Sequence, residues 1–294
     1  MSDINLTLPN LTYPYIQKGT LYIVATPIGN LGDITLRALH TLHNVDFIFC
    51  EDTRVTNRLL TFYGLKASLF MYHDHSDAHD REHILKCLRD GSSVALVSDA
   101  GTPLISDPGY KVVVDCHEQG FPLTLIPGPC ALINGLVLSG LPTDQFYFGG
   151  FLPLKMKDRE EKLLQLLSIS ASLIFYETGP KLLRTLQDFL PFFKNRKLVI
   201  ARELTKKFET IHQGTVTELC DFYHQAGPPK GELVLIMEGH SKSDVDSFVL
   251  DPLVCKNLLE KYSLKDTAEI LSIVLSQPKN TIYQSLLKFK NEAR

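Results

Sequence analysis

The sequence predicts an α/β protein with two α/β domains, a mainly parallel sheet followed by a mixed sheet, and a small helical C-terminal domain. Three observations support this prediction. Short apolar runs alternate with helical patterns through residues 21–138, and residues 145–239 repeat the alternation more loosely. Residues 264–288 contain helical patterns only. We expect three domains, spanning residues 1–141, 142–240 and 250–294.

Four apolar runs of the first domain are each followed by a loop rich in glycine, proline or charged residues and then by a helical pattern. These runs are Leu21–Ala25, Val45–Cys50, Val94–Val97 and Leu123–Ile126. Parallel strands with right-handed crossovers place such loops at one edge of a sheet. The four loops are therefore expected to form a pocket at that edge.

The loop Ser98–Gly109 follows the buried run Val94–Val97, and the sequence predicts that it carries a binding site. Asp99 stands at the carboxyl end of the strand, and Gly101 can adopt a positive φ or admit a ligand close to the backbone. Asp107 followed by a proline predicts a helix start there, as Asp33 does earlier in the chain. A tight connection whose aspartate only caps backbone amides explains the loop equally well.

Two other polar clusters have competing interpretations. Glu51-Asp-Thr-Arg54 is either a helix start, with Arg54 pairing an acid, or part of a site at the sheet edge. His73-Asp-His-Ser-Asp-Ala-His-Asp80 resembles a metal cluster but has no recognised ligand spacing, so we predict no metal there. His79-Asp80 fits a helix start, and His73 alone remains a candidate pocket residue.

The later parts of the chain predict a mixed sheet and then helices. Strands are expected at Phe146–Phe148, Leu173–Tyr176, Leu198–Ala201 and Leu233–Met237. Short connections such as Glu209–Val216 indicate that some of them pair antiparallel. The final helices, at 264–275 and 279–288, form either a helix-turn-helix or a hairpin packed on the body or a second subunit.

Composition and charge narrow the class of protein. The net charge of −3 is unevenly distributed, at −5 for residues 1–125, 0 for 126–248 and +2 for 249–294. A polyanion is therefore expected to meet the later segments. No apolar run is long enough to span a membrane, the first eighteen residues do not resemble a secretion signal, and the six cysteines are scattered. These features favour a soluble, cytoplasmic protein.

Eight motifs together resemble one family, the bacterial ribosomal RNA small subunit methyltransferase I family of tetrapyrrole-methylase-like (class III) enzymes. The motifs are TPIGN at 26–30, EDTR at 51–54, SDAGTPLISDPG at 98–109, PGPCA at 127–131, GFLP at 150–153, FYET at 175–178, ARELTK at 201–206 and GELVLIMEG at 231–239. The chain departs from the family pattern at Gly179-Pro-Lys181, where many relatives have a histidine and an arginine, and at Cys130, where many have serine.

The resemblance implies an S-adenosylmethionine-dependent enzyme that methylates the ribose 2′-hydroxyl of a cytidine in the decoding region of 16S rRNA, with the cofactor in a cleft between two α/β domains. It implies cofactor contacts at Pro27, Gly29, Asp99, Gly101, Thr102, Leu104, Ile105, Cys130, Ala131, Tyr176, Glu203 and Leu204. Candidate catalytic residues are Glu51, Asp52, Arg54, Glu203 and Lys206. We expect RNA contacts at Arg196, Lys197, Lys206, Lys207, Lys279, Asn280 and Tyr283.

The expected partners are 16S rRNA in the small ribosomal subunit and a second copy of the chain, in a homodimer. Three other functions were weighed. A tetrapyrrole methylase would share the cofactor cleft but has no evident use for a basic helical tail. A non-catalytic ribosome-assembly factor would not need the cofactor loops. A nucleotide-binding oxidoreductase is disfavoured because the chain has no G-x-G-x-x-G fingerprint.

Overall fold

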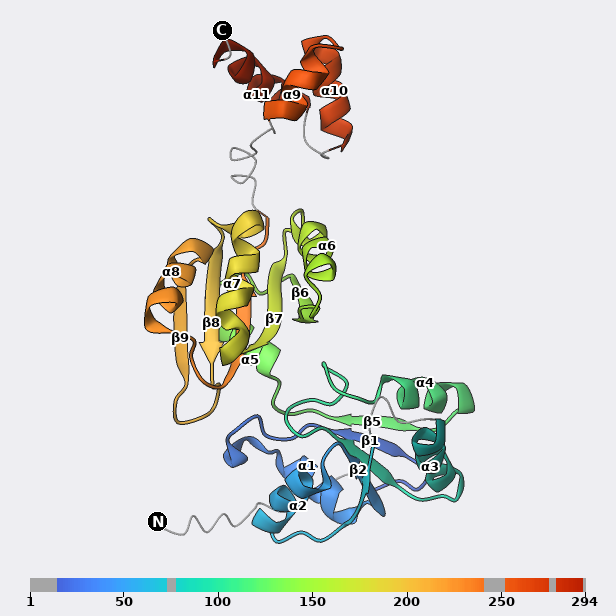
Figure 1. The fold of residues 1–294 in the computed structure, drawn as a ribbon. Helices are drawn as coiled ribbons and strands as arrows, with labels where there is room; N and C mark the ends of the chain where they lie inside the picture. The colour runs from blue at the N-terminus through green and yellow to red at the C-terminus, as the bar shows by residue number, and fades with distance from the viewer. Residues whose placement is uncertain (1–14, 73–77, 241–251, 275–278, 293–294) are drawn as a thin grey trace. The chain divides into compact units, whose positions relative to one another are not determined.

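The chain forms two compact units in a computed structural model, one of residues 1–239 and one of residues 240–294 (Figure 1). The structure describes residues 15–72, 78–240, 252–274 and 279–292. Among these residues, no helix is long and apolar enough to cross a membrane. The first unit contains two separate five-stranded sheets, in agreement with the two predicted α/β domains. The boundary at residue 141 stays a prediction.

The first sheet is parallel throughout, as predicted. Its strands are β1 (Leu21–Val24), β2 (Phe47–Cys50), β3 (Ser68–Met71), β4 (Val94–Val97) and β5 (Leu123–Ile126), in the order β3-β2-β4-β1-β5. Each neighbouring pair is parallel. Strand β3 was not predicted; it is an edge strand whose four residues are all at least partly exposed. A strand without a buried apolar run gives little signal in the sequence.

Helices cover both faces of the first sheet. They are the short 3₁₀ helix η1 (Leu31–Asp33), α1 (Leu36–Asn44), α2 (Thr53–Phe62), α3 (Ala78–Arg89) and α4 (Tyr110–Gln119). On one face, Ala95 and Val97 of β4 share a core with α1 and α2. On the other, Val94 and Leu96 share a core with α3 and α4. Both faces of β4 are therefore buried, which explains its uninterrupted apolar sequence.

Two predicted helix starts are wrong. Thr35, not Asp33, caps α1, because its hydroxyl accepts a hydrogen bond from the Ala38 N–H at 3.0 Å while Asp33 belongs to η1. Helix α4 begins after Gly109, whose φ of 132° is not helical, and not at Asp107. The loop after β4 is therefore longer than predicted.

The second sheet is mixed, as predicted. Its strands are β6 (Phe146–Phe151), β7 (Ser172–Thr178), β8 (Lys197–Arg202), β9 (Thr210–Thr215) and β10 (Glu232–Met237), in the order β6-β7-β10-β8-β9. Only the β6–β7 pair is parallel. Strand β9 was not predicted as a strand: it lies within the stretch 209–216, which was expected to be a short connection, and it pairs antiparallel with β8.

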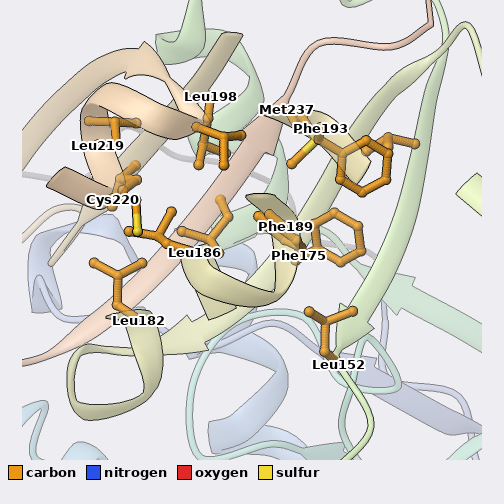
Figure 2. Close-up of a cluster of buried hydrophobic side chains, with 14 of the residues drawn as sticks. Leu152, Phe175, Leu182, Leu186, Phe189, Phe193, Leu198, Leu219, Cys220 and Met237 are labelled. Atoms are coloured by element: carbon orange, nitrogen blue, oxygen red, sulfur yellow. The ribbon is translucent and has the colours of Figure 1, made fainter. Parts of the chain in front are cut away.

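Alternate residues of the second sheet enter two different cores. Helix α5 (Ala131–Ser139) covers one face, where its Leu132 and Leu136 pack with residues such as Ile174 and Val234. Helices α6 (Met156–Leu166), α7 (Gly179–Phe193) and α8 (Val216–Ala226) cover the other. Figure 2 shows that second core, where Phe189 and Phe193 of α7 lie beside Phe175 of β7. Its fully buried aromatic and leucine side chains stabilise the packing of these helices on the sheet.

The second unit is a small helical domain made of α9 (Pro252–Leu259), α10 (Leu264–Val274) and α11 (Lys279–Glu292). Its core contains Cys255, Ala268, Leu271, Ile282 and Leu286. Helices α10 and α11 lie where the sequence predicts them, and α9 was not predicted. The helix-turn-helix and hairpin interpretations both remain open.

Candidate active site

A cavity of about 280 Å³ lies against the carboxyl end of β4, and residues of both α/β domains line it. From the first domain come residues 99–102 and 105–107 of the loop after β4. From the second come Tyr176, Glu177 and Thr178 at the end of β7, together with Leu204 and Lys206 after β8. We call this space the first cavity.

Hydrogen bonds join the loops that follow β1, β4 and β5. Thr26 and Gly101 exchange two backbone hydrogen bonds, of 2.9 and 3.1 Å. The Thr26 hydroxyl donates to the Ser98 carbonyl at 3.2 Å, and the Thr102 hydroxyl donates to the Pro129 carbonyl at 3.0 Å. The prediction that these loops meet at one edge of the sheet is confirmed.

Two short segments of unusual backbone flank the first cavity. Leu104 and Ser106 have φ angles of 72° and 68°, and Ile105 between them lines the cavity. In the second domain, Glu203 and Thr205 have φ angles of 50° and 66° on either side of Leu204, which also lines it. Left-handed conformations of non-glycine residues are costly and concentrate at functional sites. Both segments therefore make the cavity a candidate functional site.

Lys206 forms the centre of a charged cluster at the edge of the first cavity. Its Nζ lies 3.0 Å from Glu203 Oε1 and 2.7 Å from Glu232 Oε2. Partial burial opposes the lysine charge, but the two carboxylates outweigh it and raise the pKa of Lys206. The Glu232 backbone N–H, together with Lys206, holds the pKa of Glu203 below its usual range. Lys206 is therefore a fixed cation and not a base at neutral pH.

Two glycines provide space for this cluster. A Cβ on Gly29, whose φ is +143°, would lie 2.4 Å from Cγ of Lys206. A Cβ on Gly231, whose φ is +103°, would lie 2.4 Å from Oε1 of Glu203. Any larger residue at either position would displace the cluster. Gly29 was predicted as a cofactor contact, and in the structure it lies against Lys206.

Asp107 lines the first cavity, and the pKa of its carboxyl group is raised. Burial raises its pKa to about 6, a hydrogen bond from Ser98 opposes the rise, and the negative charge of Asp99 adds to it. Asp99 lines the cavity too and accepts a hydrogen bond from the Asp52 N–H at 3.1 Å. The cavity therefore presents several carboxyl groups beside an apolar wall, an environment suited to a cationic ligand.

An aromatic cluster closes the side of the first cavity formed by the second domain. The ring of Tyr176 lies edge-on to Phe148 at 4.9 Å and to Phe151 at 5.7 Å. Its hydroxyl accepts a hydrogen bond from the Leu132 N–H at 3.2 Å, and burial raises its pKa. The tyrosine therefore stays neutral and connects the start of α5 to the end of β7.

The EDTR motif forms a helix start, which is one of its two predicted interpretations. The Asp52 side chain caps α2 by accepting the Arg54 N–H at 2.8 Å. Both its oxygens also bind the Arg54 guanidinium, and these bonds hold the pKa of Asp52 well below its usual range. Glu51, Asp52 and Arg54 line neither cavity described here, so their catalytic roles stay predictions.

A second cavity, of about 510 Å³, adjoins the first. Five residues line both and form the border between them: Ile28, Asp99, Ala100, Lys206 and Glu232. The loop after β1 contributes Pro27 and Gly29 to the second cavity and not to the first. The side chains of α2 form its other wall.

The predicted cofactor residues fall into three groups. Eight line the first cavity: Asp99, Gly101, Thr102, Ile105, Cys130, Ala131, Tyr176 and Leu204. Pro27 and Gly29 line the second. Leu104 and Glu203 line neither but are the neighbours of Ile105 and Leu204.

The predicted RNA contacts are scattered. Arg196 is only 7% exposed, with its guanidinium 4.7 Å from the Phe193 ring and bonded to the Leu167 carbonyl, which argues against an RNA contact there. Lys197 and Lys207 are exposed. In α11, Lys279 pairs with Glu269, Tyr283 packs against the core of the second unit, and Asn280 is exposed.

The candidate pocket residue His73 lies outside the described residues, as do residues 74–77. His79 lies in the first turn of α3.

Several residues of these cavities were not predicted as site residues. Asp107 does not cap a helix as predicted but lines the first cavity, and its place in the same loop as Asp99 is the sequence signal for this role. Glu177, Glu232 and Phe151 belong to motifs that were noted in the sequence, but no role was assigned to them. For the α2 residues Arg58 and Phe62 the signal was their helical spacing after Arg54.

Comparison with known proteins defines the class first. A family model of tetrapyrrole (corrin/porphyrin) methylases matches residues 20–220. The structure resembles a cobalt precorrin-4 methyltransferase with a TM-score of 0.52 at 18% identity, covering 74% of this chain and 94% of that one. It also resembles a diphthine synthase with a TM-score of 0.55 at 13% identity, covering 75% and 89%. The fold is that of the tetrapyrrole methylases.

Curated relatives then define the family. A ribosomal RNA small subunit methyltransferase I of Escherichia coli O157:H7 is 45% identical over 92% of this chain and 96% of that protein. One of Erythrobacter litoralis (strain HTCC2594) is 48% identical over 92% and 95%. The chain belongs to the ribosomal RNA small subunit methyltransferase I family. It is therefore a methyltransferase that uses S-adenosylmethionine, as the motifs implied.

Proposed function

We propose that this enzyme transfers a methyl group from S-adenosylmethionine to 16S rRNA of the small ribosomal subunit, at the ribose 2′-hydroxyl of a cytidine. Its family relatives, named for the ribosomal RNA of the small subunit, support the substrate class. One structural observation carries the proposal. Two cavities meet at a border that contains both a lysine and carboxylates, so that a donor on one side can reach an acceptor on the other.

The first cavity fits the cofactor. Ile28, Ile105 and Leu204 provide apolar surface, and Asp99 and Asp107 provide negative charge. Gly101, at φ +83°, leaves space near the backbone, since a Cβ there would approach Ile28 to 3.2 Å. A ligand with a flat purine and a cationic sulfonium needs this combination of apolar surface and carboxylates. We assign this cavity to S-adenosylmethionine.

The border residues support a role in aligning and polarising the acceptor. When bound, S-adenosylmethionine supplies an electrophilic methyl group on its sulfonium sulfur. Lys206, held by Glu203 and Glu232, offers positive charge for an acceptor oxygen as its proton leaves. Asp99 lies on the same border and is fixed by the Asp52 N–H, so it is the carboxylate best placed to accept that proton.

The test uses the full chain, labelled S-adenosylmethionine and small ribosomal subunits that carry no such methyl group. Label should appear in 16S rRNA at one ribose, which mapping of alkali-resistant positions would locate. A tetrapyrrole precursor serves as the rival acceptor. Asp99→Ala should abolish cofactor binding in calorimetry while circular dichroism remains unchanged. Label in the tetrapyrrole alone would refute the RNA substrate.

A homodimer is supported by an apolar surface on α5. Ile133, Val137 and Leu138 are 41%, 68% and 47% exposed on the helix whose Leu132 and Leu136 are buried against the second sheet. A helix that is apolar all round is normally covered on every side. Light scattering should give twice the chain mass, and Val137→Glu should give monomers.

A ribosomal substrate also supports the predicted cytoplasmic location.

A further inference from the structure

Helix α2 forms one wall of the second cavity through residues spaced three or four positions apart. Val55, Arg58, Leu59 and Phe62 all line it. Residues at this spacing share one face of a helix. This wall is separate from the border, because none of these four residues lines the first cavity.

The same helix presents exposed basic and aromatic side chains. Arg54, Arg58 and Phe62 follow each other at intervals of four residues, and we call them the α2 stripe. The Arg54 side chain is 83% exposed but is paired with Asp52, whereas Arg58 is exposed and has no ion pair with any described residue. Residues 53–66 contain Arg54, Arg58 and Lys66 and no acidic residue. The stripe is therefore locally basic within an acidic domain.

Phe62 exposes most of its side chain at the end of α2. It is 65% exposed, and its ring lies edge-on to Tyr63 at 5.0 Å. The Tyr63 hydroxyl donates to the Leu31 carbonyl, and Leu31 itself lines the second cavity. The ring is thus supported from behind and leaves a face available. An exposed aromatic ring beside an arginine is a typical platform for a nucleobase.

Charge orients a ligand in the second cavity. Asp99 and Glu232 at the border disfavour an anionic group there, while Arg58 on the α2 wall attracts one. Neutral hydroxyl groups, in contrast, can hydrogen-bond to the border carboxylates and to Lys206. A ligand with a flat base, a phosphate and a ribose between them satisfies all three regions at once.

We propose that the second cavity holds the acceptor nucleotide of a single-stranded RNA segment. Its base stacks on Phe62, its phosphate contacts Arg58, and its ribose faces the border with the first cavity. This assignment rests on the proposed function. It adds an RNA contact in the acidic first domain to those expected in the later segments of the chain.

The experiment compares two single variants with matched controls. Phe62→Ala removes the platform and Arg58→Gln removes one charge. Phe222→Ala removes an exposed ring on α8, and Lys111→Gln removes an exposed charge on α4; neither residue lines the first or the second cavity. Methylation of small subunits, affinity for a cytidine-containing single-stranded RNA oligonucleotide, and affinity for S-adenosylmethionine are measured for each full-length protein.

Phe62→Ala should lower kcat/KM for small subunits by about 10- to 100-fold, the usual effect of losing one stacked base. Arg58→Gln should lower it too and reduce the salt dependence of RNA binding by about one unit of slope or slightly less. Both variants should keep wild-type cofactor affinity, and the controls should match wild type. Wild-type methylation by both variants, or loss of cofactor affinity in them, would overturn the assignment.

The outcome separates this inference from the proposed function. If wild-type enzyme methylates no RNA, the proposed function fails. The affinity for the RNA oligonucleotide then tests, independently of methylation, whether the second cavity binds RNA. Equal RNA affinity of wild type, Phe62→Ala and Arg58→Gln would reject it as an RNA site, and weaker binding by both variants would support it.

Discussion

Protonation of Asp107 should control cofactor affinity between pH 5 and pH 7. The pKa of this carboxyl is about 6, because burial and the charge of Asp99 raise it more than the Ser98 hydrogen bond lowers it. The ionised form attracts the sulfonium cation, and the protonated form does not. Affinity should therefore fall as the pH falls through 6. Among the described residues no histidine lines the first cavity, so no imidazole group of the cavity adds to the change in affinity over this pH range.

The size of the effect follows from the ionised fraction. With a pKa of about 6, about nine tenths of the molecules carry the charge at pH 7 and about one tenth at pH 5. If only the ionised form binds, affinity at pH 5 should be roughly tenfold below that at pH 7, a loss of about 1.4 kcal/mol. Calorimetric titration with S-adenosylmethionine at intervals of half a pH unit measures it.

Asp107→Asn should bind S-adenosylmethionine weakly at every pH in this range, and the exposed Asp90→Asn should keep the wild-type profile.

The raised pKa of Asp107 also makes a stability prediction for the protein without ligand. The folded state holds the Asp107 proton more tightly than the unfolded state does, so this residue's contribution to stability is lost as the pH rises from 3.8 towards about 6. Asp107→Asn should thus unfold at no lower temperature than wild type at pH 7. If the affinity of the wild-type protein for S-adenosylmethionine did not change between pH 5 and pH 7, the role of Asp107 in cofactor binding would be refuted.

Three further predictions concern the border, the glycine beside it and the C-terminal unit. Lys206→Met should reduce methyl transfer by about 100-fold with little change in cofactor affinity, since it removes positive charge from the acceptor side; a larger loss of affinity than of turnover would contradict this. Gly29→Ala should cost about 1–3 kcal/mol and lower Tm, because of its φ and the Lys206 contact, whereas Gly91→Ala, with no atom within 4 Å, tests the φ strain alone. Deleting residues 250–294 should preserve cofactor affinity but strongly reduce methylation of small subunits; full methylation would leave the helices without an RNA role.

The fold could be predicted where burial leaves a local pattern. Strands β1, β2 and β4 are short runs of mostly buried apolar residues, and the sequence shows each of them. The edge strand β5 was also predicted, although only its Ile126 is buried. The other edge strand, β3, has no buried residue and was missed. Helix α9 was not predicted, because its eight residues are too few to show a clear helical period after the polar stretch 239–252.

The site was predictable only in part, because its geometry depends on contacts between distant segments. The motif around Asp99 predicted the first cavity, since the loop after a buried parallel strand lies at the ligand-binding edge. Nothing local shows that Gly29 touches Lys206, 177 positions later, or that Lys206 borders two cavities. The burial of Arg196 was likewise not visible in the sequence, because its guanidinium packs on the ring of Phe193.

The proposed acceptor site in the first domain is compatible with the negative net charge of that domain. The first segment carries −5, yet ionic interactions between exposed groups fade over about 8–10 Å at ordinary salt, so a ligand experiences the nearest charges and not the sum. Asp99 and Asp107 lie on the cofactor cavity, where negative charge favours a sulfonium. Arg58 lies on the far wall of the second cavity, where positive charge favours a phosphate. One acidic domain can therefore bind a cation and a polyanion, provided that the border between the cavities keeps the phosphate away from the carboxylates and admits only the neutral ribose.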